Sequence, residues 1–484
     1  MKTIFSARER ASTWRKLWLW LAEAEKELGI KQISDEAIEA IKANVTVSDE
    51  AFKVAAVEER RRRHDVMAHV YALEKDAPAA AGVIHLGATS CYVLLGFLVA
   101  ELFAIVTDNA DLIFIRDALD LILPKLAKVI HNLAQFSLKY KDLPALGFTV
   151  SHYQAAQAIT LGRRGAQWLQ DLVMDLEDIE YVRAGLKFRG AQGTTGTQAS
   201  FMEIFHNDAS KIDKLNEILC KKAGFSSCYD ISTQTYTRKV DLRIANALAA
   251  LGATAVRIAT DLRHLAHDKV MEEPFEKDQI GSSAMAYKRN PMRIGRKLSN
   301  VSANFSETFS GQWLERTLDD SAIRRIDIPE MFLMADAILI SLDNVTNGLV
   351  VYPAIVNAQL REELPFMATE NIIMKLCSHG VSRQEAHEEI RVLSHQAAHV
   401  VKMEGGKNDL IERIKKTEFF AITNIYIKQK PVWGEIDGLL DPKLFIGRSP
   451  EIVERYAGAG GPVEKKLEKY KGYIMSTATA ELSV

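Results

Sequence analysis

This chain of 484 residues contains few cysteines, and neither positive nor negative charge predominates in it. Its four cysteines, Cys91, Cys220, Cys228 and Cys377, are too few and too scattered for a disulfide framework, and no Cys-x-x-Cys pair indicates a zinc site. This usage is typical of a reducing compartment, so we expect a cytoplasmic protein. Lys and Arg number 61 against 63 for Asp and Glu, a balance that argues against nucleic-acid binding through bulk charge.

Long apolar runs are also lacking. The longest extends from Cys91 to Val106 and contains Glu101, whereas a membrane-spanning helix needs about 20 apolar residues. The first residues include Arg8, Glu9 and Arg10 and lack the apolar core of a secretory signal. We therefore expect no membrane partner, and we interpret the apolar run as a buried helix.

Proline is rare, with 12 in the chain and none between residues 144 and 274. That gap permits helices much longer than three turns. Apolar side chains step by three and four from Ile244 to Leu265 and again from Met331 to Val345, a spacing that predicts long-bundle helices. A third apolar seam extends from Leu119 to Leu138, and we expect Pro124 to start or kink its helix.

Helix signals begin near the N-terminus, where Ser12 or Thr13 can cap a helix that Gly29 then ends. Apolar residues from Trp14 to Leu28 fall on one stripe of that helix. Alternating β-branched runs with Asn-Gly turns are nearly absent from the sequence. The sequence therefore predicts an all-α fold.

The predicted helices divide into three groups. We expect an N-terminal helical domain over residues 1–106, a central long-helix bundle over 107–352 and a C-terminal helical domain over 353–484, with soft boundaries at glycine-rich polar stretches. Long helices with apolar faces on more than one side usually share a bundle with neighbours. We therefore also expect an oligomer.

One polar segment stands out, from Gly281 to Met292, with the sequence GSSAMAYKRNPM. Its side chains are too small and polar to build a core. Serine hydroxyls, successive backbone N–H groups and Lys288 in one loop can surround an anion. The alternative is a solvated linker, although exposed loops often carry functional sites.

This loop resembles the signature loop of the fumarase/aspartase superfamily, Gly-Ser-Ser-x-Met-Pro-x-Lys-x-Asn-Pro, with Ala286 at the position of its first proline. Beyond the loop, nearly the whole chain resembles one branch of that superfamily, the adenylosuccinate lyase family of the animal type. The stretches that carry this resemblance are TWRKLWLWLAEAE at 13–25, RHDVMAH at 63–69, IHLGATS at 84–90, GTTGTQASF at 193–201, TQTYTRKVD at 233–241, RTLDDS at 316–321 and LPFMATENIIM at 364–374.

The resemblance implies a three-domain helical fold whose long bundle is shared in a homotetramer, with active sites built from several chains and no metal or organic cofactor. It implies β-elimination of fumarate from adenylosuccinate, giving AMP. It also implies the same reaction on succinylaminoimidazole-carboxamide ribotide, giving AICAR, within purine biosynthesis. This chemistry needs a base, a group that stabilises a dianionic aci-carboxylate, a general acid for the leaving nitrogen, and groups that hold a phosphate.

By the same resemblance, Ser282 is the base, and Lys288 in its loop stabilises the dianion. His152, within GFTVSHYQAAQ at 147–157, matches the general acid, and His64 can support it. Imidazole suits this task because its ordinary pKa lies near neutrality. The residues matched to substrate binding are Arg63, Asp65, Thr89, Ser90, Gln234, Asn290, Arg296, Arg316, Ser321 and Arg325.

The arginines of this set suit carboxylates and phosphate because a guanidinium fork binds both anions. Thr194, Thr195 and Thr197 can add hydroxyl donors, whereas we assign His69 to structure.

The chain also departs from the family pattern. Residues 150–151 separate His152 from the threonine that adjoins it in the family, and the mostly apolar residues 94–106 form an apparent insertion. Gly295 replaces an expected Glu, and the Ser-Arg-Tyr segment that helps to bind phosphate in animal members is missing from this sequence. An alternative interpretation is therefore a catalytically impaired structural or interaction member of the superfamily. An argininosuccinate lyase is disfavoured because the resemblance extends well outside the shared loop.

Overall fold

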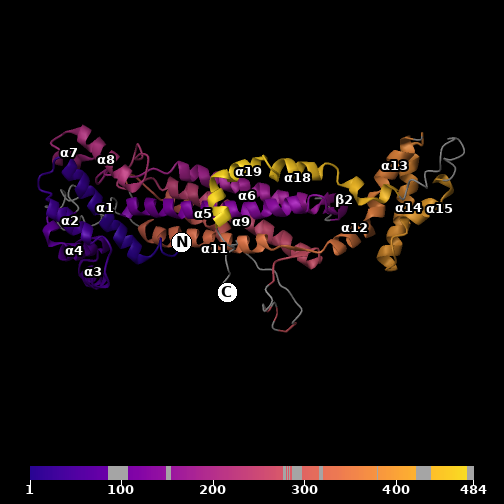
Figure 1. Cartoon of the computed structure of the whole chain (residues 1–484), viewed down its shortest axis with the longest axis horizontal. Coiled ribbons are helices and arrows are strands. Elements are labelled where there is room, and N and C mark those ends of the chain that lie inside the picture. The colour runs from indigo at the N-terminus through magenta and orange to yellow at the C-terminus, as the bar shows by residue number, and fades with distance from the viewer. Residues whose placement is uncertain are drawn as a thin grey trace. The chain divides into compact units, whose positions relative to one another are not determined.

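The computed structural model of the chain confirms a mostly helical fold (Figure 1). It describes residues 1–84, 107–148, 154–275, 280, 282, 284–285, 297–315, 320–378, 380–420 and 438–476. The apparent insertions at 94–106 and 150–151 lie outside the described residues. The chain divides into two compact units, one built from residues 1–126, 174–256 and 294–340, the other from 127–173, 257–293 and 341–484.

The first helix, α1 (Ala7–Glu27), begins earlier than the sequence predicted. Ser6 caps it by accepting a hydrogen bond from the Glu9 N–H at 3.1 Å, so the predicted start at Ser12 or Thr13 is wrong. The Ser12 hydroxyl instead accepts from the Val47 N–H at 3.2 Å, a tertiary contact inside the core. The predicted end is confirmed, since Gly29 follows α1 with a φ of +99°, which favours glycine.

In Figure 1, several further helices of the same unit gather around α1. Serines begin two of them, because the Ser34 and Ser48 hydroxyls accept from N–H groups in the first turns of α2 and α3. These elements are α2 (Asp35–Ala43), α3 (Asp49–Arg62), α4 (Asp65–Asp76), the 3₁₀ turn η1 (Pro78–Ala80), α7 (Ala199–Ile204) and α8 (Ala209–Ala223).

His69 has the structural role that we assigned to it. Its ring packs edge-on against Trp14 and Phe52, with centroids 5.5 and 5.6 Å away. Burial, helped by the positive charge of Arg15, lowers the pKa of His69 to about 4. His69 is therefore a neutral core residue near pH 7.

Glu25 is a buried carboxyl group on α1. Its exposed fraction is 0%, and among the described residues neither of its carboxyl oxygens has a hydrogen-bond partner. Burial raises the pKa of Glu25 well above its ordinary value, so the folded protein keeps it protonated where the unfolded chain has released the proton.

Replacing Glu25 with Gln is expected to remove a pH-dependent loss of stability. Above the ordinary pKa of glutamate, folding requires proton uptake at Glu25, so stability falls by about 1.4 kcal/mol per pH unit until the raised pKa is reached. Thermal unfolding at a series of pH values should show the melting temperature of Glu25→Gln rising relative to wild type as pH increases. The exposed Glu27, changed to Gln, is the matched control, and a pH-independent difference for Glu25→Gln would contradict the expectation.

Three of the four long helices carry the seams that the sequence predicted. On α9 (Lys239–His267), all the seam residues from Ile244 to Leu265 are buried, which confirms that helix. The seam from Met331 to Val345 belongs to α11 (Asp320–Asn347). Its residues are buried except for Met334, which is half-buried. The other two long helices are α5 (Asn109–Lys139) and α6 (Leu161–Ala184), and the shorter η4 (Leu298–Asn300) and α10 (Ser302–Ser310) accompany them.

Pro124 lies inside α5, so the expectation that it starts a helix is wrong, and the alternative of a kink stays a prediction. The helix begins at Asn109, upstream of the proline. The apolar face of α5, which includes Leu112, Leu119, Leu126 and Leu133, is fully buried on both sides of Pro124. This burial stabilises the helix through the position where the proline lacks an N–H donor.

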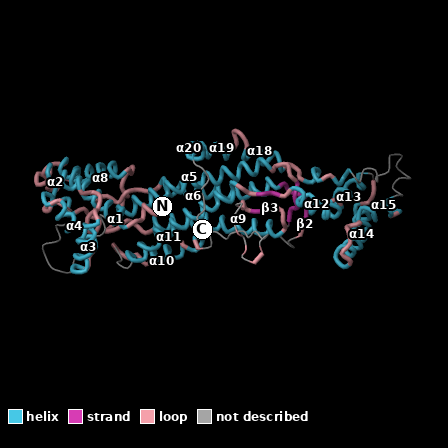
Figure 2. Tube along the Cα trace, turned by 60° about the horizontal axis from the view of Figure 1, so that its bottom comes forward, coloured by secondary structure: helices cyan, strands magenta, loops and turns pink. Residues whose placement is uncertain are grey.

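Two small antiparallel sheets modify the all-helical expectation. β1 (Pro144–Phe148) pairs with β2 (Ala155–Thr160), with an irregular register at Gly147–Phe148, and β3 (Met271–Glu272) pairs with β4 (Val350–Val351). A side chain at Gly147 would meet the Gln157 carbonyl oxygen at 2.5 Å, so glycine permits this pairing. Figure 2 shows β2 beside α12, which it contacts.

The second unit continues through a set of shorter helices. Buried side chains of α12 to α15, such as Leu364, Ile372, Ile390 and Leu410, form one apolar core. The elements are α12 (Pro353–Met367), α13 (Thr369–Ser378), α14 (Arg383–Met403), α15 (Leu410–Lys416), η5 (Gly438–Leu440), η6 (Pro442–Phe445), α18 (Ser449–Ala457), α19 (Pro462–Leu467), η7 (Glu468–Tyr470) and α20 (Lys471–Ser476).

Among the described helices, α9 alone is long and apolar enough to cross a membrane by length and composition. However, 61% of its apolar window is buried inside the protein. Core helices of soluble bundles share these properties, so α9 fits its place in the bundle.

Candidate functional site

The described part of the chain places seven of the predicted site residues. These are Arg63, His64, Asp65, Gln234, Ser282, Ser321 and Arg325. The other predicted site residues, namely His152, Lys288, Thr89, Ser90, Asn290, Arg296 and Arg316, lie outside the described residues.

A sharp junction between α3 and α4 positions the first three of these side chains. Arg63, the residue directly after α3, has a φ of +57°, a left-handed conformation that is uncommon outside glycine. His64 then caps α4, and Asp65 occupies its first turn. Such backbone strain persists only where surrounding structure supports it, and it often marks a functional site.

The hydrogen bonding of His64 defines its tautomer. The buried imidazole uses Nδ1 to accept a hydrogen bond from the Met67 N–H at 3.2 Å. A nitrogen that accepts carries no proton, so in the neutral ring the proton is on Nε2. His64 can therefore act as a hydrogen-bond donor through Nε2, and protonation of Nδ1 would break the helix cap.

Asp65 joins this junction to α11. Its Oδ2 lies 2.8 Å from a terminal guanidinium nitrogen of Arg325, whose side chain is 38% exposed. Ser321 is half-buried one turn before Arg325, within the first turns of α11. The structure therefore brings together two predicted substrate-binding residues, Asp65 and Arg325, that are far apart in the sequence.

Gln234 lies in a loop that hydrogen bonds fix to the segment before α11. The Thr233 hydroxyl donates to the Glu315 carbonyl at 2.7 Å, and the Gln312 side chain donates to the Thr235 hydroxyl at 3.1 Å. Gln234 itself is buried, with 7% of its surface exposed. The two anchored threonines flank Gln234 in the sequence, so their hydrogen bonds fix the backbone at Gln234.

A buried ion cluster lies where three long helices begin. Asp108 precedes α5, Asp241 is in the first turn of α9, and Asp320 begins α11, positions where the helix dipole favours negative charge. Arg238 joins two of them, since its Nε lies 2.6 Å from an Asp320 oxygen and its NH1 lies 3.1 Å from an Asp108 oxygen. The fifth member, Arg324, has its Nε 2.8 Å from an Asp241 oxygen. The cluster is fully desolvated, with every member at most 5% exposed.

Two further groups adjoin the ion cluster. The Tyr236 hydroxyl donates to Asp241 at 2.7 Å, and Asp111 lies 3.1 Å from the Arg324 guanidinium. Burial alone would raise the pKa of Asp108, but the guanidinium groups of Arg238 and Arg324 hold it below its usual value. Asp108 is therefore ionised, and the cluster depends on mutual pairing of its charges.

The ion cluster is next in sequence to predicted substrate-binding residues at two places. Asp320 and Arg324 directly precede Ser321 and Arg325, and Arg238 closes the loop that contains Gln234. Because its members are rigidly paired, the cluster fixes the backbone that presents those side chains. The cluster was not predicted, although the sequence carries a signal for it: Asp241 and Arg324 lie on the apolar seams of α9 and α11 when these are extended toward the start of each helix.

Ser282 lies half-buried in its loop. Its Oγ accepts hydrogen bonds from the Met285 N–H at 3.2 Å and, more weakly, from the Ala284 N–H at 3.4 Å. N–H groups directed at a hydroxyl oxygen stabilise negative charge on it. The local geometry therefore favours a serine that gives up its proton, which is what a serine base requires.

The threonines at 194, 195 and 197 lie in a glycine-rich turn. Gly193, Gly196 and Gln198 all have positive φ, so the backbone turns tightly there. The Thr195 and Thr197 hydroxyls lie 3.3 Å apart and both residues are exposed. This turn presents hydroxyl donors on a constrained backbone.

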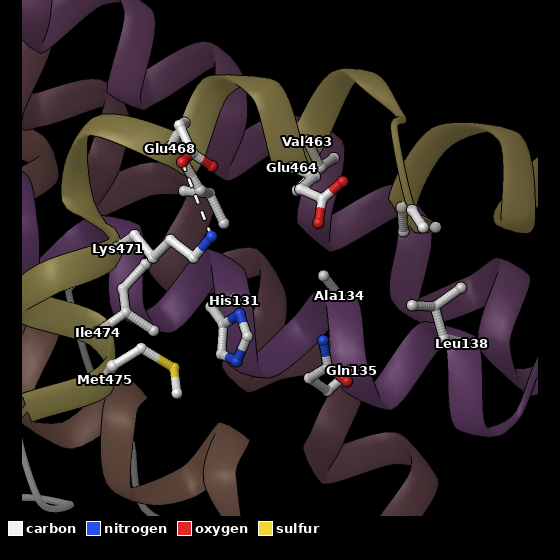
Figure 3. A pocket seen from close by; sticks show the side chains of 14 residues that line it. His131, Ala134, Gln135, Leu138, Val463, Glu464, Glu468, Lys471, Ile474 and Met475 are labelled. Carbon is white, nitrogen blue, oxygen red and sulfur yellow. Dashed lines mark ion pairs between the residues drawn. The ribbon is translucent and has the colours of Figure 1, made fainter.

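A pocket of about 310 Å³ opens between α5 and the C-terminal helices (Figure 3). His131 and Gln135 project from α5 toward Glu464 and Lys471, and an ion pair of 3.7 Å joins Lys471 to Glu468. None of the predicted site residues lines this pocket. It is therefore separate from the chemistry that the sequence indicates.

Comparison with protein families and sequences gives matches across most of the chain. A family described as "Lyase" matches residues 6–301, and one described as "Adenylosuccinate lyase C-terminus" matches residues 365–456. Adenylosuccinate lyase of Schizosaccharomyces pombe is 52% identical over 98% of this chain and 94% of the relative, and that of Saccharomyces cerevisiae is 51% identical over the same shares. Adenylosuccinate lyase of Schistosoma mansoni is 46% identical over 96% of this chain and 93% of the relative.

Solved structures with a similar fold are more distant in sequence. A fumarate lyase from Mesorhizobium sp. BNC1 matches with a TM-score of 0.75 at 21% identity, covering 94% of this chain and 97% of that one. The 3-carboxy-cis,cis-muconate lactonizing enzyme from Pseudomonas putida matches with a TM-score of 0.74 at 22% identity, covering 97% of each chain. These likenesses show the fold alone.

Proposed function

The chain belongs to the adenylosuccinate lyase family, and from this membership we infer that it eliminates fumarate from adenylosuccinate to give AMP. We propose the same elimination from succinylaminoimidazole-carboxamide ribotide to give AICAR, so that the enzyme serves purine biosynthesis twice. The observation that carries the proposal is identity above 50% to yeast adenylosuccinate lyases over 98% of the chain.

Ser282 is the proposed base. It removes a proton from the substrate carbon beside a carboxylate, and the electron pair passes into that carboxylate as a dianionic aci-carboxylate. Two loop N–H groups on the serine oxygen support this assignment. Lys288, six residues further along the loop, is proposed to stabilise the dianion.

His152 is the proposed general acid, which protonates the leaving nitrogen as the C–N bond breaks. It falls in the connection between β1 and β2, whose pairing fixes both ends of that connection. His64 is proposed to assist through its Nε2–H. No metal or organic cofactor enters this scheme, because the dianion is stabilised by a lysine and backbone amides.

The substrate anions are assigned to the remaining predicted residues. Thr89 and Ser90 are proposed to bind the succinyl carboxylates, together with Asn290. Gln234 supplies an amide, and the phosphate and carboxylates are assigned to the arginine forks and a serine hydroxyl. That last group comprises Arg296, Arg316, Ser321 and Arg325. Arg63 and Asp65 are proposed as further substrate contacts, and Asp65 also orients Arg325.

A panel of three substrates tests this function against its alternatives. We expect the purified protein to release fumarate from adenylosuccinate and from succinylaminoimidazole-carboxamide ribotide, but not from argininosuccinate. If the well-folded protein releases fumarate from neither purine substrate, the alternative of a catalytically impaired structural or interaction protein is favoured instead. Release from argininosuccinate alone would assign the chain to the other lyase.

Replacing Asp65 with Asn is expected to raise KM for adenylosuccinate by about tenfold, a free-energy change of about 1.4 kcal/mol. Without the carboxylate, the half-exposed Arg325 side chain loses the partner that orients it. Steady-state kinetics should show a smaller change in kcat than in KM. The exposed pair of Glu451 with Arg448, 2.9 Å apart, offers the control Glu451→Gln, and equal KM values for both variants would contradict the role of Asp65.

We further propose that the enzyme is a cytoplasmic homotetramer in which each active site takes Ser282, His152 and Thr89 from different chains. Two inactive variants, Ser282→Ala and His152→Ala, should then regain fumarate release when they are unfolded together and refolded as mixed tetramers. The regained activity comes from sites that draw an intact serine and an intact histidine from different chains. A mixture that stays as inactive as its components would contradict shared sites.

A further inference from the structure

Two cysteines that the proposed mechanism does not use lie in direct contact. Cys220 is in the last turns of α8, and Cys228 is in the loop that follows it. Their Sγ atoms are 3.4 Å apart, a thiol–thiol hydrogen-bond contact rather than a bond. A disulfide requires an S–S distance of about 2.05 Å, so a shift of about 1.4 Å between the sulfurs would join them.

The pair is accessible to small reagents from a cavity of about 640 Å³. Both cysteines line the cavity, along with Asn216, Phe225 and Tyr229. Cys220 is 4% exposed, and Cys228 is half-buried. A small oxidant can therefore reach the sulfurs from this cavity.

The contact also makes the two thiols chemically unequal. The hydrogen bond from Cys228 lowers the pKa of the Cys220 thiol, against the opposing effect of burial. The pKa of Cys228 is raised, first by that same hydrogen bond and then by burial. Cys220 is thus the more acidic thiol of the pair, and Cys228, with its sulfur 3.4 Å away, stands beside it as the resolving partner.

We propose that Cys220 and Cys228 form a reversible disulfide with a peroxide as the oxidant. The Cys220 thiolate attacks one oxygen of hydrogen peroxide, the O–O bond breaks, and Cys220 becomes a sulfenic acid as one water is released. The Cys228 sulfur then attacks the Cys220 sulfur, the S–O bond breaks, and a second water leaves with the thiol proton. Two thiols and one peroxide give one disulfide and two waters, and a dithiol reductant reverses the change.

The disulfide would disturb the glycine-rich turn that carries the predicted threonine donors. Asn216 holds the start of this turn, since its Oδ1 accepts from the Ala191 N–H at 2.7 Å, and Cys228 Sγ lies 3.7 Å from the same oxygen. Gly190 is packed so closely that a side chain there would lie 2.5 Å from Cys228 Sγ. Moving this sulfur therefore alters the packing beneath residues 190–198.

We expect this movement to reduce kcat/KM for adenylosuccinate by about tenfold or more, because displacements of about 1 Å away from the chemistry can cost on the order of 100-fold in rate. This effect on activity rests on the proposed function. The formation of the disulfide does not rest on the proposed function, so the disulfide and its effect on activity can fail separately.

Peptide mapping tests the disulfide directly. Trypsin cuts after Lys214, Lys221, Lys222 and Arg238, so Cys220 and Cys228 fall on different peptides, 215–221 and 223–238. After treatment of the full-length protein with hydrogen peroxide, mass spectrometry without reduction should find these two peptides linked, and dithiothreitol should separate them. The link should be absent from Cys220→Ser and Cys228→Ser and present in the control Cys377→Ser.

The proposal is overturned if peroxide leaves both peptides unlinked, or if Cys220 pairs with Cys91 or Cys377 instead. For the effect on activity, the oxidised protein should regain its kcat/KM after dithiothreitol, and Cys228→Ser should keep its activity in peroxide. A linked protein with unchanged kcat/KM would overturn the coupling to the glycine-rich turn. Peroxide inactivation of Cys228→Ser as complete as that of wild type would overturn it as well.

Discussion

Replacing Ser282 with Ala is expected to lower kcat by about 10²- to 10⁴-fold while KM for adenylosuccinate changes little. The hydroxyl acts on the substrate proton in the transition state, and the surrounding anion-binding groups remain in place. The N–H groups of Ala284 and Met285, which donate to the serine oxygen, would lose that acceptor. Steady-state fumarate release by the purified variant gives both constants.

A second serine controls for the loss of a hydroxyl. Ser310 donates to the Glu307 carbonyl at 3.1 Å at the end of α10, outside the predicted site, and Ser310→Ala should keep its activity. If Ser282→Ala keeps near-normal kcat, the base must be another residue. If its KM rises as much as its kcat falls, Ser282 binds the substrate rather than reacting with it.

Replacing Arg324 with Met is expected to lower the free energy of unfolding by about 3–5 kcal/mol. Arg324 pairs with Asp241 and Asp111 and lies 3.8 Å from Asp108, and its side chain is 5% exposed. Without the guanidinium, these buried carboxylates have too little positive charge beside them. Each must then be protonated or repel its neighbours, and both outcomes favour the unfolded chain.

Thermal unfolding measures this effect, and Arg391 provides its control. Arg391 pairs with Glu388 on the exposed face of α14, where a salt bridge contributes about 0–1 kcal/mol, so Arg391→Met should leave the melting temperature nearly unchanged. An equal fall in melting temperature for both variants, or no fall for Arg324→Met, would show that the ion cluster does not stabilise the fold.

The long helices whose apolar residues repeat at helical spacing were predictable from the sequence. The seams of α9 and α11 repeat over many turns, so the sequence located their buried faces correctly. The start of α1 was not predictable, because Ser6 and Ser12 both suit a helix cap, and only the tertiary contact of Ser12 with Val47 decides between them. Pro124 likewise lies within a helix because its neighbours are buried.

The candidate site rests on family motifs, and physical reasoning on single residues contributed less to it. The contact of Asp65 with Arg325 joins positions that nothing in the local sequence connects. The ion cluster had a visible signal, since Asp241 lies three residues before Ile244 on the same stripe. A charged residue on an apolar seam predicts a buried pair, but its partner is known only when the helices are packed.

The reverse reaction in heavy water tests the central claim most directly, because it reports both the activity and the proton transfer. The protein is given fumarate and AMP in D₂O, and the adenylosuccinate that forms is analysed by mass spectrometry and NMR. If a base adds a solvent-derived proton to carbon, the product carries a single deuterium, on the carbon next to the one bonded to nitrogen. Failure to form adenylosuccinate, or product without carbon-bound deuterium, would contradict the proposed elimination.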